Sequence, residues 1–327
     1  MGNMESQMRK GMKRKILAVL CAAVALAVLA TLGGGYYMVG YALRPVNRGK
    51  DIEGSWKVMR NAYPQLVPWV DSLRQAKALR DTFITAPDGV RLHAYYVRAA
   101  RPTRHTAVVV HGYTDNAVRM MHIGHMYNQA LHCNVLLPDL RYSGMSGGEA
   151  IQMGWLDRKD VMQWIGLAPR LFGDSLHVVV HGISMGAATT MMLSGEELPS
   201  YVTCFVEDCG YTSVWEQFAR ELKAQFHLPP FPLLYAADGI CRLQYGWGFR
   251  EASALGQVEK CRKPMLFIHG DKDDYVPTYM VYRLYAAKPA PKELWVVPGA
   301  AHAVSYKEHP IAYTERVRHF VQEYMDR

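Results

Sequence analysis

The sequence of 327 residues lacks the patterns by which proteins commonly hold metals and nucleotides. It has six cysteines but no Cys-x-x-Cys pair and no zinc-like spacing, and it contains neither a Gly-x-Gly-x-x-Gly run nor a phosphate-binding loop. His122 and His125 could share one face of a helix, but no carboxylate pattern accompanies them, which favours a packing role. The sequence therefore predicts no metal and no cofactor.

Cysteine usage is also too sparse to fix the redox compartment. Three of the six cysteines lie in apolar runs, which leaves an odd number elsewhere: Cys209, Cys241 and Cys261. A disulfide between Cys241 and Cys261 is the alternative in an oxidising compartment, whereas free thiols are the simpler interpretation.

Net positive charge is small over most of the chain, although the formal net charge of the whole is +8. Residues 1–15 carry +4 and residues 44–60 carry +3, so residues 61–327 carry only +1. A domain that binds nucleic acid should keep its positive charge on the folded surface. The distribution therefore argues against a nucleic-acid partner, and the basic residues instead flank a hydrophobic segment.

That segment, residues 16–43, has 28 residues and not one Asp, Glu, Lys, Arg or His. About 20 apolar residues suffice to cross a bilayer, so the segment is long enough for a single-pass signal-anchor. Lys13-Arg14-Lys15 stands directly before it, and Tyr36, Tyr37 and Tyr41 lie near its far end, where aromatic rings favour the membrane interface. We therefore expect the chain to contact the membrane through this N-terminal helix.

Orientation and processing of this segment leave alternatives open. The dense basic cluster before the segment favours residues 1–15 inside and the bulk of the chain outside, in an extracytoplasmic location. Arg44, Arg48 and Lys50 on the other flank dilute this asymmetry. A cleaved signal peptide, with Val28-Leu29-Ala30 at the cleavage site, is the alternative to an uncleaved anchor.

The remaining chain predicts an α/β fold. Residues 44–80 have apolar residues at helical spacing and should form connecting helices, whereas residues 81–327 alternate strands with helices. Short, nearly continuous apolar strands separated by helices are typical of a mostly parallel sheet covered on both faces. The expected strands are 83–85, 92–97, 107–110, 134–137, 177–180, 202–207, 265–269 and 294–297, and the expected helices are 118–131, 153–167, 186–193 and 311–325.

Two connections stand out from this alternation. Pro87-Asp88-Gly89 is a turn signature, so the first two strands should form an antiparallel hairpin. Residues 211–262 are too long for a simple connection between strands and are rich in aromatic residues, which predicts a helical cap insertion at about these positions.

The motif Gly182-Ile183-Ser184-Met185-Gly186 lies between a predicted strand and a predicted helix. This placement is typical of a nucleophile elbow, a sharp turn that holds a serine in a strained backbone conformation. A serine hydroxyl is a weak nucleophile and needs a histidine base with an orienting acid. Ser184 is therefore the candidate nucleophile.

In this arrangement the acid and the histidine should follow the serine in the chain, each after a later strand. His302 lies in the loop after the last predicted strand and is the candidate base. Four residues are candidates for the acid: Asp271, Asp273 and Asp274 follow strand 265–269, and Asp208 follows strand 202–207.

A tetrahedral oxyanion also needs hydrogen-bond donors. The backbone amide of Met185, directly after the nucleophile, is one candidate. The loop after strand 107–110 should supply the other, which we expect to be the backbone amide of Tyr113, while Gly112 lets the backbone approach the substrate.

These motifs resemble those of serine hydrolases of the α/β-hydrolase superfamily over residues 80–327. Residues Asp139 to Ser146 resemble the family's Asp-x-Arg-Gly-x-Gly-x-Ser loop, although Tyr142 stands where a glycine is usual. The run Gly270-x-x-Asp273-x-x-Val276-Pro277 resembles the family's acid motif and singles out Asp273, and Gly299-x-x-His302 resembles its histidine motif. Within the superfamily, the chain resembles bacterial membrane-anchored hydrolases that are similar to the serine-aminopeptidase-like group and to eukaryotic acyl-protein thioesterases.

The resemblance implies an α/β-hydrolase fold and a Ser184-His302-Asp273 triad that cleaves carboxylic esters or thioesters through an acyl-enzyme. A small-molecule or lipid-like acyl ester is the expected substrate, because no acidic pair is evident to hold a substrate amine. A serine peptidase with the same triad and a non-catalytic binding protein are the alternatives.

Overall fold

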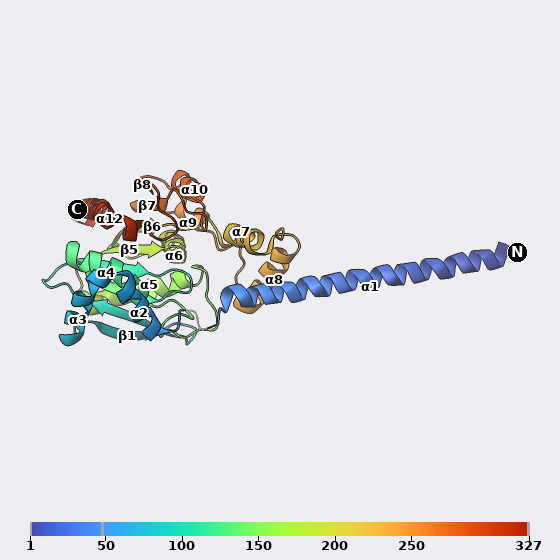
Figure 1. Ribbon diagram of the computed structural model, residues 1–327, viewed down its shortest axis with the longest axis horizontal. Coiled ribbons are helices and arrows are strands. Elements are labelled where there is room, and N and C mark those ends of the chain that lie inside the picture. The colour runs from blue at the N-terminus through green and yellow to red at the C-terminus, as the bar shows by residue number, and fades with distance from the viewer. Residues whose placement is uncertain (1, 47–48, 326–327) are drawn as a thin grey trace. The chain divides into compact units, whose positions relative to one another are not determined.

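The computed structural model describes residues 2–46 and 49–325 and divides them into two compact units (Figure 1). One unit, here called the sheet unit, comprises Leu43–Gln217 and the chain from Phe249 onward. The other, here called the anchor–cap unit, comprises the N-terminal helix up to Ala42 together with Phe218–Gly248.

The sheet unit is built on an eight-stranded sheet with strand order β1-β2-β4-β3-β5-β6-β7-β8, counted over the described residues. β1 and β2 form the predicted antiparallel hairpin, β2 is also antiparallel to β4, and the neighbours from β4 to β8 run parallel. The strands are β1 (Arg80–Thr85), β2 (Arg91–Val97), β3 (His105–Val110), β4 (Asn134–Pro138), β5 (His177–Ile183), β6 (Val202–Asp208), β7 (Met265–Gly270) and β8 (Lys292–Val297).

Burial explains why these segments form strands. Every residue of β4 and β7 is buried, and β3 and β5 are buried after their first residue, as expected for parallel strands covered on both faces. The hydrophobic core on one face joins strand residues to α2 (Ile52–Ala62), α3 (Val67–Gln75), α4 (Met121–His125) and α12 (Pro310–Met325). Helix α6 (Met185–Ser194) also packs against the sheet, and it is flanked by α5 (Asp157–Phe172) and α9 (Ala254–Val258). Helix α10 (Tyr279–Ala287) contacts β7 and β8.

Two predicted helices differ from those in the structure. The expected helix 118–131 is broken into a 3₁₀ turn (Ala117–Met120), α4 and a π turn (Met126–Ala130). The helix expected at 153–167 instead begins at Asp157, because Met153 and Gly154 have positive φ angles of 49° and 85°. The Asp157 carboxylate accepts a hydrogen bond from the Gly154 backbone N–H at 2.8 Å and so fixes the turn that precedes the helix.

The anchor–cap unit contains α1 (Gly2–Leu43), most of α7 (Val214–Phe226) and α8 (Leu233–Tyr245). The insertion Phe218–Gly248 is narrower than the expected cap at about 211–262. Its two ends are tied together within the sheet unit, where the Trp215 N–H donates to the Phe249 carbonyl at 3.0 Å and the Val214 N–H to the Ala252 carbonyl at 2.9 Å. All six cysteines are free thiols, including Cys241 and Cys261.

Candidate active site

The loops after three parallel strands bring Ser184, Asp273 and His302 together in the sheet unit. Ser184 lies between β5 and α6 with φ 57° and ψ −118°, a strained conformation for a residue with a side chain. A Cβ atom on Gly186 would collide with the Val110 carbonyl oxygen, and one on Gly182 would collide with the Gly186 carbonyl oxygen. The two glycines of the motif are therefore required for this sharp turn.

The three side chains form a hydrogen-bonded chain. Ser184 Oγ lies 2.8 Å from His302 Nε2, and His302 Nδ1 lies 2.7 Å from Asp273 Oδ2. In this arrangement the carboxylate accepts from Nδ1–H, which leaves Nε2 free to accept the serine proton. The His302 side chain is 20% exposed, whereas the Asp273 side chain is fully buried.

Asp273 is set apart from the other candidate acids by its surroundings. Its Oδ1 accepts the backbone N–H groups of Tyr275 and Val276 at 3.1 and 2.8 Å. Burial alone would raise the pKa of this carboxyl, but hydrogen bonds to His269 and His302, aided by the Val276 N–H, lower it to about 2. Asp273 is therefore ionised at neutral pH.

The alternative acids occupy other positions. Asp271 and Asp274 are exposed, and Asp271 accepts the Gly299 N–H at 2.7 Å. Asp208 is buried, but its carboxylate accepts from the Tyr313 hydroxyl at 3.0 Å, and burial raises its pKa to about 6. Its backbone carbonyl also holds the Ser184 N–H at 2.8 Å.

A second histidine, His269 near the end of β7, also faces Asp273, although its place in a predicted buried strand indicates no site role. Its Nε2–H donates to the Val276 carbonyl at 2.8 Å and lies 3.4 Å from Asp273 Oδ2. Burial would lower the pKa of His269, but Asp273 and Glu207 raise it above its usual value. The signal in the sequence was its place directly before the Gly270 acid motif.

The loop after β3 reaches the serine, as expected for an oxyanion site. A Cβ atom added to Gly112 would lie 3.5 Å from Ser184 Cβ and 3.4 Å from the Ile183 carbonyl oxygen, so Gly112 and Tyr113 pass beside the nucleophile. Met185 is the first residue of α6. Tyr113 and Met185 thus belong to two segments that both adjoin Ser184.

His111 positions this loop. Its Nδ1 lies 2.8 Å from the Gly112 carbonyl, to which it donates, and its Nε2 accepts the Leu140 N–H at 2.9 Å. These partners fix the neutral tautomer with hydrogen on Nδ1. Burial also lowers the pKa of His111, which keeps the ring neutral.

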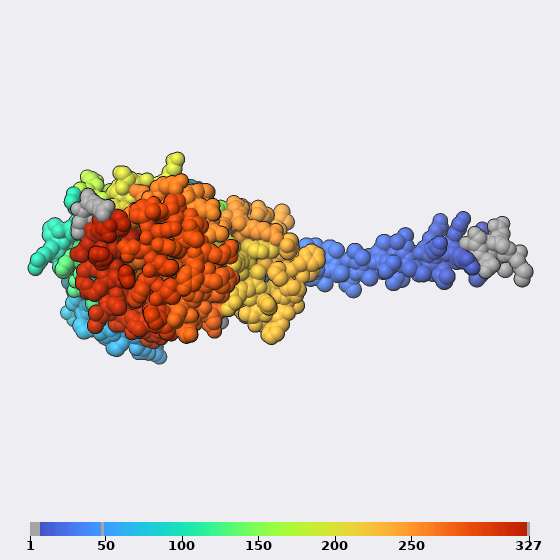
Figure 2. Space-filling model, turned by 90° about the horizontal axis from the view of Figure 1, so that it is seen from above, coloured from blue at the N-terminus to red at the C-terminus, as the bar shows by residue number. Residues whose placement is uncertain are grey.

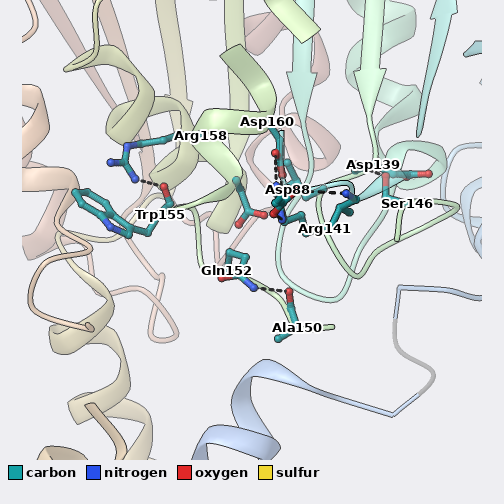
Figure 3. A network of polar contacts seen from close by, with 12 residues as sticks. Asp88, Asp139, Arg141, Ser146, Ala150, Gln152, Trp155, Arg158 and Asp160 are labelled. Atoms are coloured by element: carbon teal, nitrogen blue, oxygen red, sulfur yellow. Dashed lines mark hydrogen bonds and ion pairs between the residues drawn. The ribbon is translucent and has the colours of Figure 1, made fainter. Parts of the chain in front are cut away.

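The loop that follows β4 connects neighbouring segments of the sheet unit through hydrogen bonds and ion pairs. Asp139 accepts the Ala117 N–H at 2.7 Å, the Met145 N–H at 2.9 Å and His93 Nδ1–H at 2.7 Å. Figure 3 shows Arg141 of the same loop paired with Asp88 and with Asp160, the latter at 2.9 Å. A Cβ atom on Gly144 would collide with the Asp139 carboxylate, which explains the glycine. Tyr142, at the other usual glycine position, has φ 63°, so this chain holds a bulky residue in a conformation that favours glycine.

One group of side chains near the serine has the ligand types of a metal site. Ligand atoms of Cys209, Asp273 and His302 lie within 4.8 Å of one another. Burial and the neighbouring carboxylates raise the pKa of the Cys209 thiol well above its usual value, so the thiolate that metals require is strongly disfavoured. Asp273 and His302 are, moreover, already hydrogen-bonded to each other. This donor set fits a metal poorly.

One cavity lies between the start of α2 and Tyr113 of the loop after β3. It measures about 350 Å³, and its lining includes Asp51, Ser55, Tyr113, Asp115 and Arg119. Asp51 caps α2 by accepting the Gly54 N–H at 2.8 Å, and Asp115 pairs with Arg119 at 3.0 Å. Both carboxylates that line the cavity therefore already have partners within the protein.

Strand order, strand ends and the serine turn together define an α/β-hydrolase fold of the serine hydrolase type. The chain belongs to the prolyl oligopeptidase family, whose model matches residues 150–327. It is 33% identical over 238 residues to protein YqkD of Bacillus subtilis, a match that covers 73% of this chain and 77% of YqkD. The Arabidopsis thaliana α/β hydrolase domain-containing protein WAV2 is 26% identical and matches 64% of this chain and 67% of its own length.

Solved structures agree with this fold. The esterase Pf2001 of Pyrococcus furiosus superposes with a TM-score of 0.62 at 25% sequence identity, covering 76% of this chain and 91% of the esterase. The expected membership of the α/β-hydrolase superfamily is thereby confirmed.

Proposed function

We propose that the chain is a serine hydrolase that cleaves carboxylic esters or thioesters through an acyl-enzyme. Ser184 attacks the acyl carbon while His302 Nε2 takes its proton, and the leaving alcohol or thiol departs with that proton. Water then attacks the acyl-enzyme, His302 again takes a proton, and Ser184 is released with the free acid. The observation that carries this proposal is the unbroken chain from Ser184 Oγ to Asp273, with both hydrogen bonds below 3 Å.

Electrostatics supports the same roles. An Asp273 carboxyl with a pKa near 2 stays charged over the working pH range and stabilises the His302 imidazolium that forms in each step. The backbone amides of Tyr113 and Met185 are the proposed oxyanion donors. The N-terminus of α6, at Met185, adds its dipole to the stabilisation of that negative charge.

A peptidase on the same triad is the second candidate, favoured by the family to which the chain belongs. An aminopeptidase needs a carboxylate to bind the substrate amine, and Asp51 and Asp115 line the cavity beside Tyr113. Because one caps a helix and the other pairs with Arg119, neither is an open amine site, and we favour ester substrates. Turnover of p-nitrophenyl esters of increasing chain length should exceed that of aminoacyl anilides. Faster anilide cleavage that Asp115→Asn abolishes would reverse this choice.

The catalytic proposal is tested with a fluorophosphonate probe, which labels activated serines. The wild-type chain should be labelled, Ser184→Ala should lose all labelling, and Ser146→Ala, which changes another buried serine, should keep it. An unlabelled wild-type chain would instead favour the non-catalytic binding protein.

We also propose that α1 anchors the chain in a membrane, with the catalytic domain outside the cytoplasm. Gln7–Leu43 is long and apolar enough to cross a bilayer. The protein should remain in the membrane fraction after high-salt and alkaline washes, and protease added to spheroplasts should digest the domain. Release by alkali, or a mature N-terminus near Thr31, would contradict the anchor, and a protease-protected domain would reverse its orientation.

A further inference from the structure

The last turns of α1 differ from the rest of that helix. Its hydrophobic residues from Ile16 to Leu29 are largely exposed, and the 18-residue window that qualifies as a span has no buried residue. Further along, Gly35 and Val39 are buried, and Thr31, Gly34 and Met38 are half-buried. These positions repeat every three to four residues, so one face of the helix end is covered.

The covering element is α8 of the same unit. A Cβ atom on Gly35 would lie 3.0 Å from both Ala236 Cβ and the Ala237 backbone N, and one on Gly34 would lie 2.9 Å from Leu233 Cδ1. Glycines thus let α1 and α8 approach closely, as small residues do between membrane helices. Gly33 and Gly40, on other faces of α1, have open space around them. Figure 1 shows α8 beside this end of α1.

The end of α7 holds the same part of α1. The Tyr41 hydroxyl donates to Gln225 Oε1 at 3.0 Å, and the Tyr41 ring packs edge-to-face on Phe226 with centroids 5.7 Å apart. Figure 2 shows the cap residues, in yellow, against the C-terminal end of α1, in blue. The anchor helix and the cap are therefore packed together on two sides.

The length of the span sets the depth of this contact in a bilayer. If the hydrocarbon begins after Lys15, about 20 residues at 1.5 Å each cross it, so it ends close to Gly35. Leu233 touches α1 at Gly34, and Ala236 touches it at Gly35. The start of α8 therefore lies at the boundary between hydrocarbon and headgroups.

The loop joining α7 to α8, residues 227–232, has a composition that suits this depth. It contains no Asp, Glu, Lys or Arg, and it exposes Leu228 at 41% and Phe231 at 70%. Phe226 before it and Tyr235 after it are also exposed, at 37% and 47%. A continuous exposed apolar segment of this kind marks an interaction surface, and bulky apolar side chains with a tyrosine at the rim suit a lipid surface.

We propose that the cap loop, residues 227–232, inserts into the outer leaflet of the bilayer that α1 spans. This rests on the proposed membrane anchor and extends it, because the cap then becomes a second membrane contact. Packing on α1 brings the loop to the interface, and burial of Phe231 and Leu228 among acyl chains removes their apolar surface from water. The partner is the lipid bilayer itself.

An environment-sensitive fluorophore tests the insertion in the full-length chain reconstituted in phosphatidylcholine nanodiscs. Phe231→Cys and Leu228→Cys are labelled with NBD in a Cys21→Ala background, where the remaining native cysteines are buried. Ile311→Cys, at an 80% exposed apolar site of the sheet unit, is the control. We expect blue-shifted emission and at least twofold quenching by doxyl-labelled lipids at 231 and 228, with neither effect at 311.

The anchor and the loop fail in different ways in this experiment. Protein that does not stay in the nanodisc contradicts the anchor, whereas anchored protein with the same water-like emission at 231, 228 and 311 overturns loop insertion. Neither readout depends on hydrolytic activity.

A matched pair of glycine variants tests whether α1 holds the loop in place. Gly35→Ala forces a methyl group against Ala236 and Ala237, so α8 must shift and quenching at position 231 should fall by half or more. Gly33→Ala makes the same chemical change two residues away in open space and should leave quenching unchanged. Equal quenching in both variants would overturn the role of the glycine contact.

Discussion

The sheet unit contains two sets of Ser, His and Asp side chains that share an Asp–His hydrogen bond but differ in whether the histidine also contacts the serine hydroxyl. In both sets a histidine Nδ1 lies 2.7 Å from an aspartate Oδ2: His302 with Asp273, and His93 with Asp139. His302 Nε2 lies 2.8 Å from the Ser184 hydroxyl oxygen, whereas His93 Nε2 has no hydrogen-bond partner among the described residues and lies 3.8 Å from Asp81.

The serines differ as well. Ser146 Oγ donates to the Asp139 main-chain carbonyl at 2.7 Å and accepts the His93 backbone N–H at 2.8 Å, so both of its hydrogen-bonding roles serve the backbone. The His93 side chain is fully buried, while that of His302 is 20% exposed. A buried Asp–His pair is therefore not sufficient for catalysis, because the base also needs an open nitrogen and a serine that is not already engaged.

The comparison is tested most strongly by removing each aspartate charge. Asp273→Asn should lower kcat by about 10⁴-fold, by analogy with the same change in a serine protease, because His302 loses the partner that fixes its tautomer. Asp139→Asn should leave kcat of the folded protein within a few fold and lower its stability. Esterase kinetics and urea unfolding of both variants measure the two effects.

The reason for the second outcome is that Asp139 accepts three hydrogen bonds through two oxygens. An asparagine retains only one acceptor oxygen, and each buried donor left unpaired costs about 1–3 kcal/mol. A large loss of kcat in fully folded Asp139→Asn would contradict the separation of the two sets.

The parallel strands were predictable from the sequence because their signal is local. Runs such as Val178-Val179-Val180 are apolar on both faces, and the observed strands extend the predicted ones by only a few residues at their ends. Ser184, Asp273 and His302 follow three such strands, so knowing the strands places the residues at one edge of the sheet, where the structure brings them together.

Other features depend on contacts between distant residues. His93 pairs with Asp139 across 46 positions, and nothing near His93 in the sequence indicates this partner. The packing of α1 on the cap joins Tyr41 to Gln225 across 184 positions, and a glycine run inside an apolar helix has no evident role until the helix facing it is known. The start of α5 differs from the expected position because Met153 and Gly154 have positive φ, which no sequence pattern around them indicates.

Asp208 offers a third case for comparison with Asp273 and Asp139. It is a buried carboxyl beside the candidate site, but its hydrogen-bond donor is Tyr313 and not a histidine. Burial raises its pKa to about 6 in the folded protein, above the ordinary value of 3.8. The folded state therefore binds the proton more tightly, and this contribution to stability is complete below about pH 4 and lost as pH rises through 6.

The expected effect is on the order of 3 kcal/mol, since each unit of pKa difference corresponds to about 1.4 kcal/mol. Wild-type stability relative to Asp208→Asn should fall by this amount between pH 4 and pH 7 in urea unfolding, while kcat of the variant stays within a few fold. A loss of kcat as large as that of Asp273→Asn would move the catalytic acid from β7 to β6.

The smallest expected effect separates the two serines. Ser146→Ala removes one buried donor and one acceptor and leaves the His93 N–H and the Asp139 carbonyl without this partner, which should lower the free energy of unfolding by about 1–3 kcal/mol. Its esterase activity should stay near that of the wild type. Ser184→Ala should do the opposite: activity is lost, and stability is unchanged or slightly higher, because within the described residues the Ser184 hydroxyl hydrogen-bonds to one side chain, that of His302. Loss of activity in both variants, with both fully folded by circular dichroism, would contradict the view that of these two Asp–His pairs only His302–Asp273 serves a nucleophile.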